Sequence, residues 1–189
     1  MKELKTAVLF CLTVTLLCGG LYPAVVTGIA AALFPRQAAG SLVIDDQGRT
    51  IGSQLIGQPF TAPQYFWPRP SATPEFPYNP AASGGSNSGP SNPDFLKTVA
   101  QRVQAIRDSG VTGAIPADLI LASASGLDPH ISPEAAAVQT TRVAMARGIT
   151  GALVGHLVAA HTEDRQAGFL GEPRINVLAL NLALDKVSP

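Results

Sequence analysis

Two short stretches hold most of the residues that could do chemistry. The first, Ser83-Gly84-Gly85-Ser86-Asn87, could wrap an anion with its backbone N–H groups, as glycine-rich loops do in many proteins. The same composition is typical of turns, because glycine and asparagine adopt positive φ at little cost and serine bonds to nearby backbone. We interpret this stretch as a turn, with an anion-binding loop as the alternative.

The second stretch runs from Gly126 to Glu134 and contains Asp128, His130 and Glu134, three residues of metal-ligating types. Their spacing is irregular. Ser132-Pro133-Glu134 also has the pattern of a helix start, with a capping serine, a proline and an acid in the first turn. We therefore favour a structural role over a metal site for this stretch.

One function that we consider is catalytic: the chain could be a membrane-anchored, extracytoplasmic hydrolase. Ser86 or Ser125 could combine with His130 and Asp128 as nucleophile, base and acid. The sequence has no G-x-S-x-G elbow and no Walker A motif, since none of its four lysines follows the required glycine pattern. His156 and His161 are five residues apart and share no helix face, so they do not predict a metal pair. We expect no catalytic, cofactor-binding or metal-binding residues in this chain.

The composition favours a membrane-associated chain. Of the 189 residues, 46% are hydrophobic and only 14% are charged, and the formal net charge is zero. A neutral chain lacks the electrostatic footprint of a nucleic-acid binder. The only cysteines, Cys11 and Cys18, lie in the first apolar run, which excludes a disulfide framework or a cysteine-ligated zinc in the rest of the chain.

The longest irregular stretch covers residues 64–93 and is rich in proline, which fixes φ and removes backbone donors, so no regular helix or strand is expected there. Six of the eleven aromatic residues lie between positions 60 and 78. Aromatic side chains bury large apolar areas, and disordered segments contain few of them. We predict an ordered loop with buried aromatic side chains and an arginine bound to loop carbonyls or an acid, namely Phe66, Trp67, Tyr78 and Arg69.

The remaining sequence predicts more helices than strands. Four segments combine a capping residue with apolar residues at helical spacing. They run from Asn92-Pro93 to Asp108, from Ser132-Pro133 to Arg147, from Gly151 to His161 after a Thr150 cap, and from about Asn176 toward the C-terminus. Short apolar runs predict strands at 41–45, 49–56 and 118–122. The fold class expected is an α+β soluble domain attached to a single N-terminal transmembrane helix.

Residues 6–35 contain no charged side chain. At 1.5 Å per residue, about 20 residues already cross the hydrocarbon core of a bilayer. A cleaved signal peptide is the alternative, but its apolar region would be only about 7–15 residues long. We expect a membrane anchor at residues 1–36, in contact with lipid, and a soluble extracytoplasmic domain at residues 37–189.

Small residues recur every four positions along this run, at Gly20, Ala24, Gly28 and Ala32. In lipid such a stripe lets another helix approach closely. The alternative is that glycine and alanine are simply common in membrane helices. Pro23 lies in the same run, and its ring would meet the carbonyl of Gly19, which predicts a kink where Gly19-Gly20 gives room.

Motifs along nearly the whole chain resemble one known family in their order and spacing. They are Gly52–Gln58, Tyr65–Ala72, Tyr78-Asn79, Ser83–Asn87, Gly89–Pro93, Ala124–Pro133, Arg142–Ala144, Ala146–Gly148 and Leu170–Leu178. On these motifs the chain resembles the C subunit of the Kdp high-affinity potassium-transporting P-type ATPase. Two departures are Ser88, where a leucine is expected, and a loose version of the proline segment at Ile115–Asp118.

The resemblance implies a non-catalytic accessory subunit of an ATP-driven potassium importer. The implied partners are a channel-like potassium-binding subunit, a P-type ATPase subunit and a very small membrane subunit, and these partners handle ATP and potassium. The C subunit is implied to support assembly and to raise the nucleotide affinity of the ATPase subunit. The residues expected to contact partners are Gly20, Ala24, Gly28, Arg69, Ser83, Gly84, Gly85 and Asn87.

The expected location is the inner (plasma) membrane, with a single pass, a cytoplasmic N-terminus and an extracytoplasmic domain. Lys2, Lys5 and the amino terminus stand against Arg36 and Arg49, which tilts weakly toward this orientation under the positive-inside rule. The family resemblance implies the same orientation.

Overall fold

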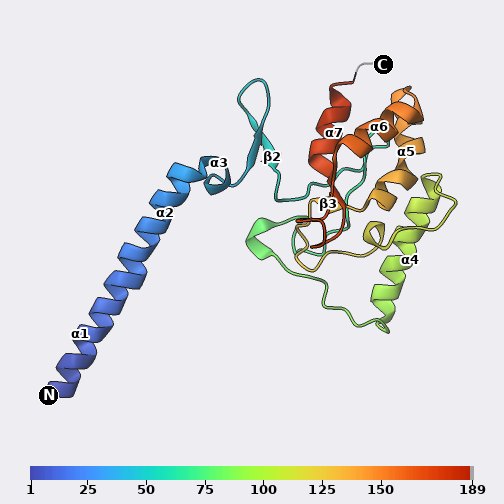
Figure 1. Ribbon diagram of the computed structural model, residues 1–189. Coiled ribbons are helices and arrows are strands. Elements are labelled where there is room, and N and C mark those ends of the chain that lie inside the picture. Colours follow the sequence, from blue (N-terminus) through green and yellow to red (C-terminus); the bar gives the residue numbers. More distant parts are fainter. Residues whose placement is uncertain (188–189) are drawn as a thin grey trace. The chain divides into compact units, whose positions relative to one another are not determined.

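A computed structural model describes residues 1–187 of the chain (Figure 1). The chain divides into two compact units, which adjoin in sequence at Ser53 and Gln54. The first unit contains an apolar helix long enough to span a membrane, and the second combines helices with a small sheet. The predicted α+β fold class is thus confirmed, with one N-terminal helix in the described residues that is long and apolar enough to span a membrane.

The first unit begins with a continuous apolar helix. Its parts are α1 (Lys2–Leu16), the π-helical turn η1 (Leu17–Leu21) and α2 (Tyr22–Leu33). Together they form a span of 32 residues with no buried side chain. Within the π turn, the Tyr22 N–H donates to the carbonyl of Leu17, five residues back. The wider turn accommodates Pro23, which has no N–H and whose ring would crowd a regular helix. The disturbance predicted at Gly19-Gly20 therefore takes the form of a π turn.

A short helix, α3 (Pro35–Ala38), leads into an antiparallel hairpin of β1 (Leu42–Ile44) and β2 (Thr50–Ser53). The turn is closed by Asp45, whose carboxylate accepts hydrogen bonds from the backbone N–H of Gln47 and from Arg49. The strands predicted at 41–45 and 49–56 are confirmed, although the second ends three residues earlier than expected.

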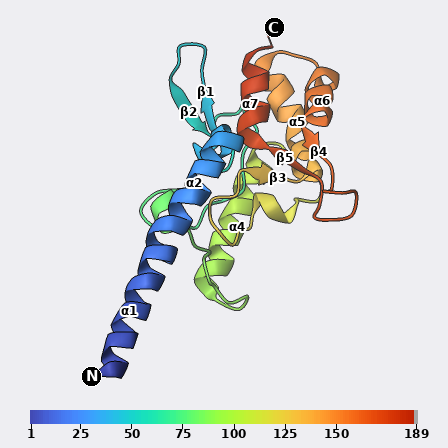
Figure 2. The same ribbon diagram turned by 60° about the vertical axis from the view of Figure 1, so that its left-hand side comes forward.

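The second unit contains four helices and a three-stranded sheet within the described residues. The helices are α4 (Pro93–Asp108), α5 (Pro133–Arg147), α6 (Gly151–Ala160) and α7 (Val177–Asp185). The strands are β3 (His130–Ile131), β4 (Thr162–Glu163) and β5 (Arg174–Asn176), in the antiparallel order β3-β5-β4. Figure 2 shows these strands side by side below α5, α6 and α7.

Each of the four helices begins where its capping residue predicts. Asn92, Ser132, Thr150 and Asn176 accept hydrogen bonds from backbone N–H groups in the first turn of α4, α5, α6 and α7. At the other end of α5, Gly148 adopts φ 66°, the left-handed conformation that closes many helices. The predicted starts of all four helices are thus confirmed.

The strand predicted at residues 118–122 is wrong. The structure has a 3₁₀ turn there, η3 (Ala117–Leu119), in which only Leu119 is buried. A short apolar run does not distinguish a strand from a buried turn, and Pro116 removes a backbone donor next to it. The three strands of the sheet are only two or three residues long, too short to show a period-two pattern, so the sequence analysis missed them.

The core of the second unit joins α4, α5, α6, α7, β3 and β5 around fully buried side chains. Among them are Val143 on α5, Val154 on α6, Ile175 on β5 and Leu180 on α7, none of which has any exposed area. Phe66 belongs to the same core, although it lies in the irregular loop and not in any helix or strand. The irregular loop therefore contributes side chains to the core of the second unit.

Candidate functional site

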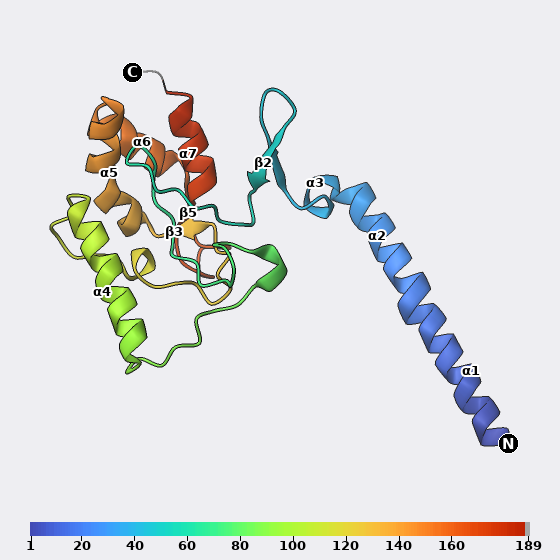
Figure 3. The ribbon, with the colours of Figure 1, turned by 180° about the vertical axis from the view of Figure 1, so that it is seen from behind.

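Two buried amide side chains hold the aromatic part of the loop. Asn181 on α7 accepts from the Phe66 N–H at 2.9 Å and donates to the Phe66 carbonyl at 3.0 Å. Gln139 on α5 accepts from the Trp67 N–H at 2.8 Å and donates to the Trp67 carbonyl at 3.2 Å. Two consecutive residues of the loop thus have both backbone groups paired, as in a sheet, but with side chains as partners. Figure 3 shows this segment passing alongside α5 and α7.

Two arginines on α5 add charge and stacking to this attachment. The Arg142 guanidinium lies 4.1 Å from the centre of the Trp67 ring and donates to the carbonyl of Tyr65. Arg147 lies 5.0 Å from the Tyr65 ring and donates to Asp185 at 2.7 Å. Burial lowers the pKa of Arg142 to about 10, so the group stays protonated near neutral pH. Cation–π contacts of this kind contribute about 0.5–2 kcal/mol each.

Tyr78 closes the loop on itself. It adopts φ 59°, is 6% exposed, and its hydroxyl donates to the carbonyl of Arg69. Burial raises the pKa of the Tyr78 hydroxyl, and the nearby Asp128 carboxylate adds to the rise, so the group is neutral and serves as a donor. Gly57 packs against this ring so closely that any side chain there would collide with it. The prediction that Phe66, Trp67 and Tyr78 are buried is confirmed, with Trp67 only partly covered.

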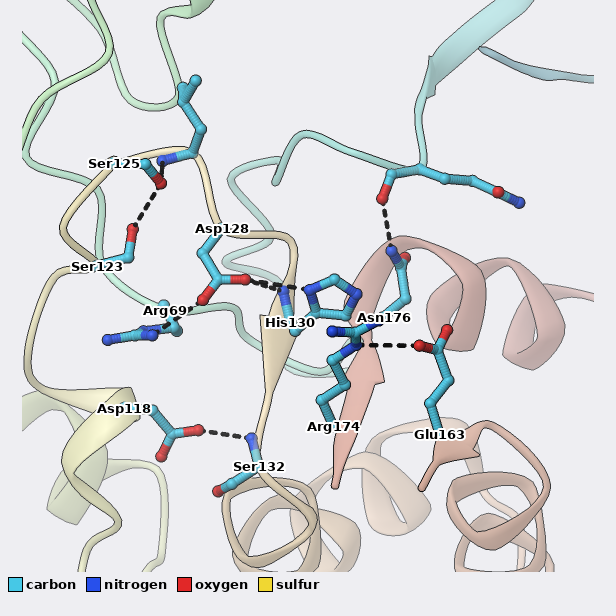
Figure 4. Close-up of polar contacts among 12 residues, drawn as sticks. Arg69, Asp118, Ser123, Ser125, Asp128, His130, Ser132, Glu163, Arg174 and Asn176 are labelled. Atoms are coloured by element: carbon cyan, nitrogen blue, oxygen red, sulfur yellow. Dashed lines mark hydrogen bonds and ion pairs between the residues drawn. The ribbon is translucent and has the colours of Figure 1, made fainter. Parts of the chain in front are cut away.

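Asp128 lies between Arg69 and His130 (Figure 4). One carboxylate oxygen accepts from the Arg69 guanidinium at 2.9 Å, and the other lies 3.2 Å from His130 Nδ1 and accepts from the His130 N–H. Burial alone would raise the pKa of Asp128, but the hydrogen bonds from His130 and Arg69 outweigh it and lower that pKa below 3.8. The predicted bond between Arg69 and an acid is confirmed, and it ties the loop to the segment that leads into β3.

The glycine-serine part of the loop lies against residues 123–126. The Gly84 N–H and the Ser83 hydroxyl both donate to the Ser125 carbonyl, at 2.9 and 3.1 Å. A Cβ at Gly85 would lie 3.0 Å from the Ala124 carbonyl oxygen, so only glycine fits there without a shift. Asn87 is exposed and adopts φ 50°. One N–H of the supposed anion loop already has a partner in the fold. The predicted turn is wrong, because residues 83–89 contain no turn and form an irregular segment held against residues 123–126.

The predicted serine nucleophiles do not meet the histidine. The Ser125 hydroxyl accepts from the Leu127 N–H and lies 3.4 Å from the Ser123 hydroxyl. His130 bonds to Asp128, and within residues 1–187 no hydrogen bond links it to Ser86 or Ser125. The same described residues contain no cluster of three histidine, cysteine, aspartate or glutamate side chains arranged for a metal. The arrangement supports an ion-paired structural joint.

A cleft of about 740 Å³ opens beside this joint, within the second unit. Its walls include Arg69, Asp128 and His130 on one side and Asp118 and Glu134 near the start of α5 on the other. The Asp118 carboxylate accepts from the Ser132 N–H at 2.6 Å and so fixes the entry into α5 (Figure 4). The sequence singled out Arg69, Asp128, His130 and Glu134, but the cleft that these residues share was not predicted.

The small-residue stripe lies in the first unit. Gly20 and Gly28 have open space where a Cβ would be, and the helix that carries them with Ala24 buries no side chain within the described residues. The expected contact residues are therefore in two groups. Arg69, Ser83, Gly84, Gly85 and Asn87 belong to the second unit, whereas the stripe belongs to the membrane-length helix.

Sequence reasoning missed the residues that hold the loop. Gln139 is 1% exposed and Asn181 is 1% exposed, and both lie on helix faces that are otherwise apolar. A polar residue on a core-facing position is the signal that could have identified them, because a buried amide must find partners. Their partners, the backbones of Trp67 and Phe66, are 72 and 115 residues away, so no local pattern could name them.

Comparison with known proteins gives a consistent result over the full length. The family model of KdpC, the c chain of K⁺-transporting ATPases, matches residues 4–186. The potassium-transporting ATPase KdpC subunits of Geobacter sulfurreducens and Geobacter metallireducens are 70% and 65% identical over 189 residues, covering 100% of each chain. That of Geotalea uraniireducens is 67% identical over 188 residues, again covering 100% of each chain. As its motifs predicted, the chain belongs to the KdpC family of potassium-transporting ATPase subunits.

Proposed function

We propose that this chain is a non-catalytic accessory subunit that assembles and stabilises an ATP-driven potassium uptake complex. The partners are the channel-like potassium-binding subunit, the P-type ATPase subunit and the small membrane subunit of that complex. The observation that carries the proposal is the loop attachment: Asn181 and Gln139 fix the loop as part of the core. This attachment anchors the buried aromatic part of the loop, so the exposed glycine-serine part that follows it is presented to a partner from a fixed base and loses less entropy on binding.

The membrane-length helix supplies a second contact region. The face with Gly20, Ala24 and Gly28 has no partner within the described residues, and it would pack against a helix of a partner subunit. Replacing Gly28 by leucine would separate the two helices, whereas Val26→Leu on another face would change only lipid contacts. We expect Gly28→Leu to reduce recovery of the complex more than Val26→Leu does, and equal recovery would count against the stripe.

The orientation proposed is a cytoplasmic N-terminus and an extracytoplasmic domain. The Ser83–Asn87 segment would then lie across a hydrocarbon core of about 30 Å from cytoplasmic ATP. Any rise in the nucleotide affinity of the ATPase subunit would therefore pass through the partner subunits as a coupling free energy, without contact between this chain and ATP. The chain would hold no cofactor, and the complex would handle ATP and potassium.

The assembly proposal is tested by isolating the tagged full-length chain from detergent-solubilised native membranes. We expect the other subunits of the potassium-transporting complex to co-purify with it, and isolation of the chain alone would contradict the proposal. A non-catalytic role is tested by the double variant Ser86→Ala/His130→Ala, which should keep potassium uptake. Loss of uptake from a complex that still assembles would support a hydrolase instead.

The orientation is tested by labelling one cysteine. Ser86 is exposed, so Ser86→Cys in a Cys11→Ser/Cys18→Ser background should react with a membrane-impermeant thiol reagent on intact cells. The control is the same background without the new cysteine. Labelling only after lysis would place the domain in the cytoplasm and make direct contact with ATP possible.

A further inference from the structure

The cleft beside Asp128 has an apolar wall as well as charged edges. Ile115, Val138 and Pro173 line it, and the buried Ile131 lies at its floor. Its volume of about 740 Å³ is in the range of clefts that take up ligands or the side chains of a partner. The charges around it decide which chemistry it fits.

The basic groups of the cleft are already neutralised within the fold. Arg69 pairs with Asp128 at 2.9 Å, and His130 bonds to the same carboxylate. Arg174 pairs with Glu163 at 3.0 Å. An anionic ligand would therefore have to compete with carboxylates that are held in place by the fold.

Two carboxylates of the cleft have no basic partner within residues 1–187. Asp118 uses one oxygen to accept from the Ser132 N–H and forms no ion pair. Glu134, in the first turn of α5, is exposed and forms neither an ion pair nor a side-chain hydrogen bond there. The remaining cleft carboxylate outside the Asp128 joint, Glu172, pairs with Arg165. The unmatched charge of the cleft is therefore negative.

A projecting apolar tip adjoins the cleft. The loop between β4 and β5 folds back through a bridge of Gln166 and Leu170, and its base is closed by the Arg165–Glu172 ion pair. At its end Phe169 and Leu170 are 72% and 53% exposed. Glu172 and Pro173, which follow this tip in the chain, line the cleft, so the loop that carries the tip ends at the edge of the cleft. Exposed aromatic residues of this kind are common as anchors of protein–protein interfaces.

We propose that this cleft and tip form a docking surface for an extracytoplasmic segment of a partner subunit, a segment that carries an arginine or lysine beside an apolar side chain. The proposal rests on the proposed function and names the contact chemistry. The basic side chain lays its aliphatic stem along Ile115 and Val138 and directs its charge to Asp118 and Glu134. The apolar neighbour packs on Phe169. Anionic lipid headgroups do not fit, because the same carboxylates repel them.

The chain contains a matched pair of residues for the test. Glu134 and Asp94 each follow a capping residue and a proline in the first turn of a helix, α5 and α4 respectively, but only Glu134 lines the cleft. Lysine at either position disturbs the helix terminus alike. The difference between Glu134→Lys and Asp94→Lys therefore reports the cleft itself. Similar thermal unfolding midpoints for the two variants would show that neither has unfolded.

The measurement is the amount of partner subunits retained on the tagged full-length chain, in washes of increasing sodium chloride. We expect Glu134→Lys to retain at least threefold less than Asp94→Lys, and Glu134→Gln to show a smaller loss in the same direction. Equal retention by Glu134→Lys and Asp94→Lys would overturn the docking proposal while leaving assembly intact. A wild-type chain that retains no partner would instead overturn the proposed function.

A photoreactive benzoylphenylalanine in place of Phe169 identifies the occupant of the tip. In native membranes we expect an adduct with a protein subunit of the complex, and none from the same probe at Leu96, which is 51% exposed but does not line the cleft. Adducts with lipid alone, or with no other molecule, would overturn the proposal.

Discussion

The two halves of the irregular loop both lack regular secondary structure, but their backbone groups find hydrogen-bond partners in different places. The aromatic half, residues 64–78, is held by side chains of α5 and α7, and Phe66 has no exposed area. The glycine-serine half, residues 83–92, bonds outward from Ser83 and Gly84 to Ser125, and most of its residues are exposed or half-buried. Neither half has regular secondary structure. The difference lies in whether buried partners satisfy the backbone.

This difference separates a supporting element from a surface element. A backbone whose N–H and carbonyl groups are paired inside a core cannot move without leaving those groups unsatisfied. A backbone that bonds to one neighbouring segment, with its side chains in solvent, can exchange those bonds for contacts with a partner. The aromatic half therefore determines stability, and the glycine-serine half is free to determine binding.

The largest effect is expected from Phe66→Ala. Removing a fully buried phenylalanine should lower the free energy of unfolding by about 3–5 kcal/mol, because both transfer energy and packing are lost. Thermal unfolding of the detergent-solubilised chain, followed by the fluorescence of Trp67, the only tryptophan, measures it. The control Phe76→Ala removes an aromatic side chain that is 52% exposed and should change stability little. Similar losses from both variants would break the comparison.

A smaller loss is expected from Asn181→Ala, which leaves the Phe66 N–H and carbonyl unpaired in the core. We expect a cost of about 2–3 kcal/mol, since each buried unsatisfied group costs about 1–3 kcal/mol and water can enter the space left by the amide. Urea unfolding of the solubilised chain is the measurement. Asn87→Gly removes an exposed amide at a position of positive φ and should cost nothing; an equal loss there would contradict the assignment.

Acidification should weaken the attachment of Arg69 to Asp128, in the segment that leads into β3. The pKa of Asp128 is lowered below its ordinary 3.8 in the fold, so the carboxylate contributes stability above that pH and loses it as the pH falls through the lowered pKa. The unfolding midpoint of the wild type should therefore fall more steeply below about pH 4 than that of Asp128→Asn. Parallel pH profiles would show that the Asp128 carboxylate, with its bonds from His130 and Arg69, adds no stability.

The smallest effect is expected in the glycine-serine half. Ser83→Ala removes one exposed hydrogen bond to Ser125 and should change the free energy of unfolding by no more than about 0.5 kcal/mol. If the half serves binding, the same substitution should still reduce recovery of the partner subunits. A large change in stability with unchanged recovery would reverse the roles assigned to the two halves.

The features that could be predicted from the sequence are the ones with local causes. Asn92, Ser132, Thr150 and Asn176 mark helix starts because a capping side chain bonds only two or three residues ahead. The long uncharged run predicted the membrane-length helix because the hydropathy and length of one continuous segment are enough to identify it. The aromatic composition of the loop also predicted its order, since those side chains have to be buried.

What could not be predicted depends on distant partners. The sheet consists of strands of only two or three residues. No local pattern marks where they start, at His130, Thr162 and Arg174. The residues 118–122 looked like a strand because apolar content alone does not specify backbone geometry. The cleft is formed where α5, β3 and the loop before β5 meet. That Glu134 has no basic partner there can be recognised only once the ion pairs of the other charged residues are known.

The attachment of the loop by Gln139 and Asn181 also constrains the order in which the chain can fold. These contacts join residues 72 and 115 positions apart, so the contact order of this region is high. Because the chain is synthesised from its N-terminus, the aromatic segment is made before α5 and α7, the helices that it packs against. The aromatic segment therefore lacks its partner on α7 until that last helix has been synthesised. Truncation of the chain before Asn181 would thus remove the two hydrogen bonds that hold Phe66, although every residue of the loop itself would be present.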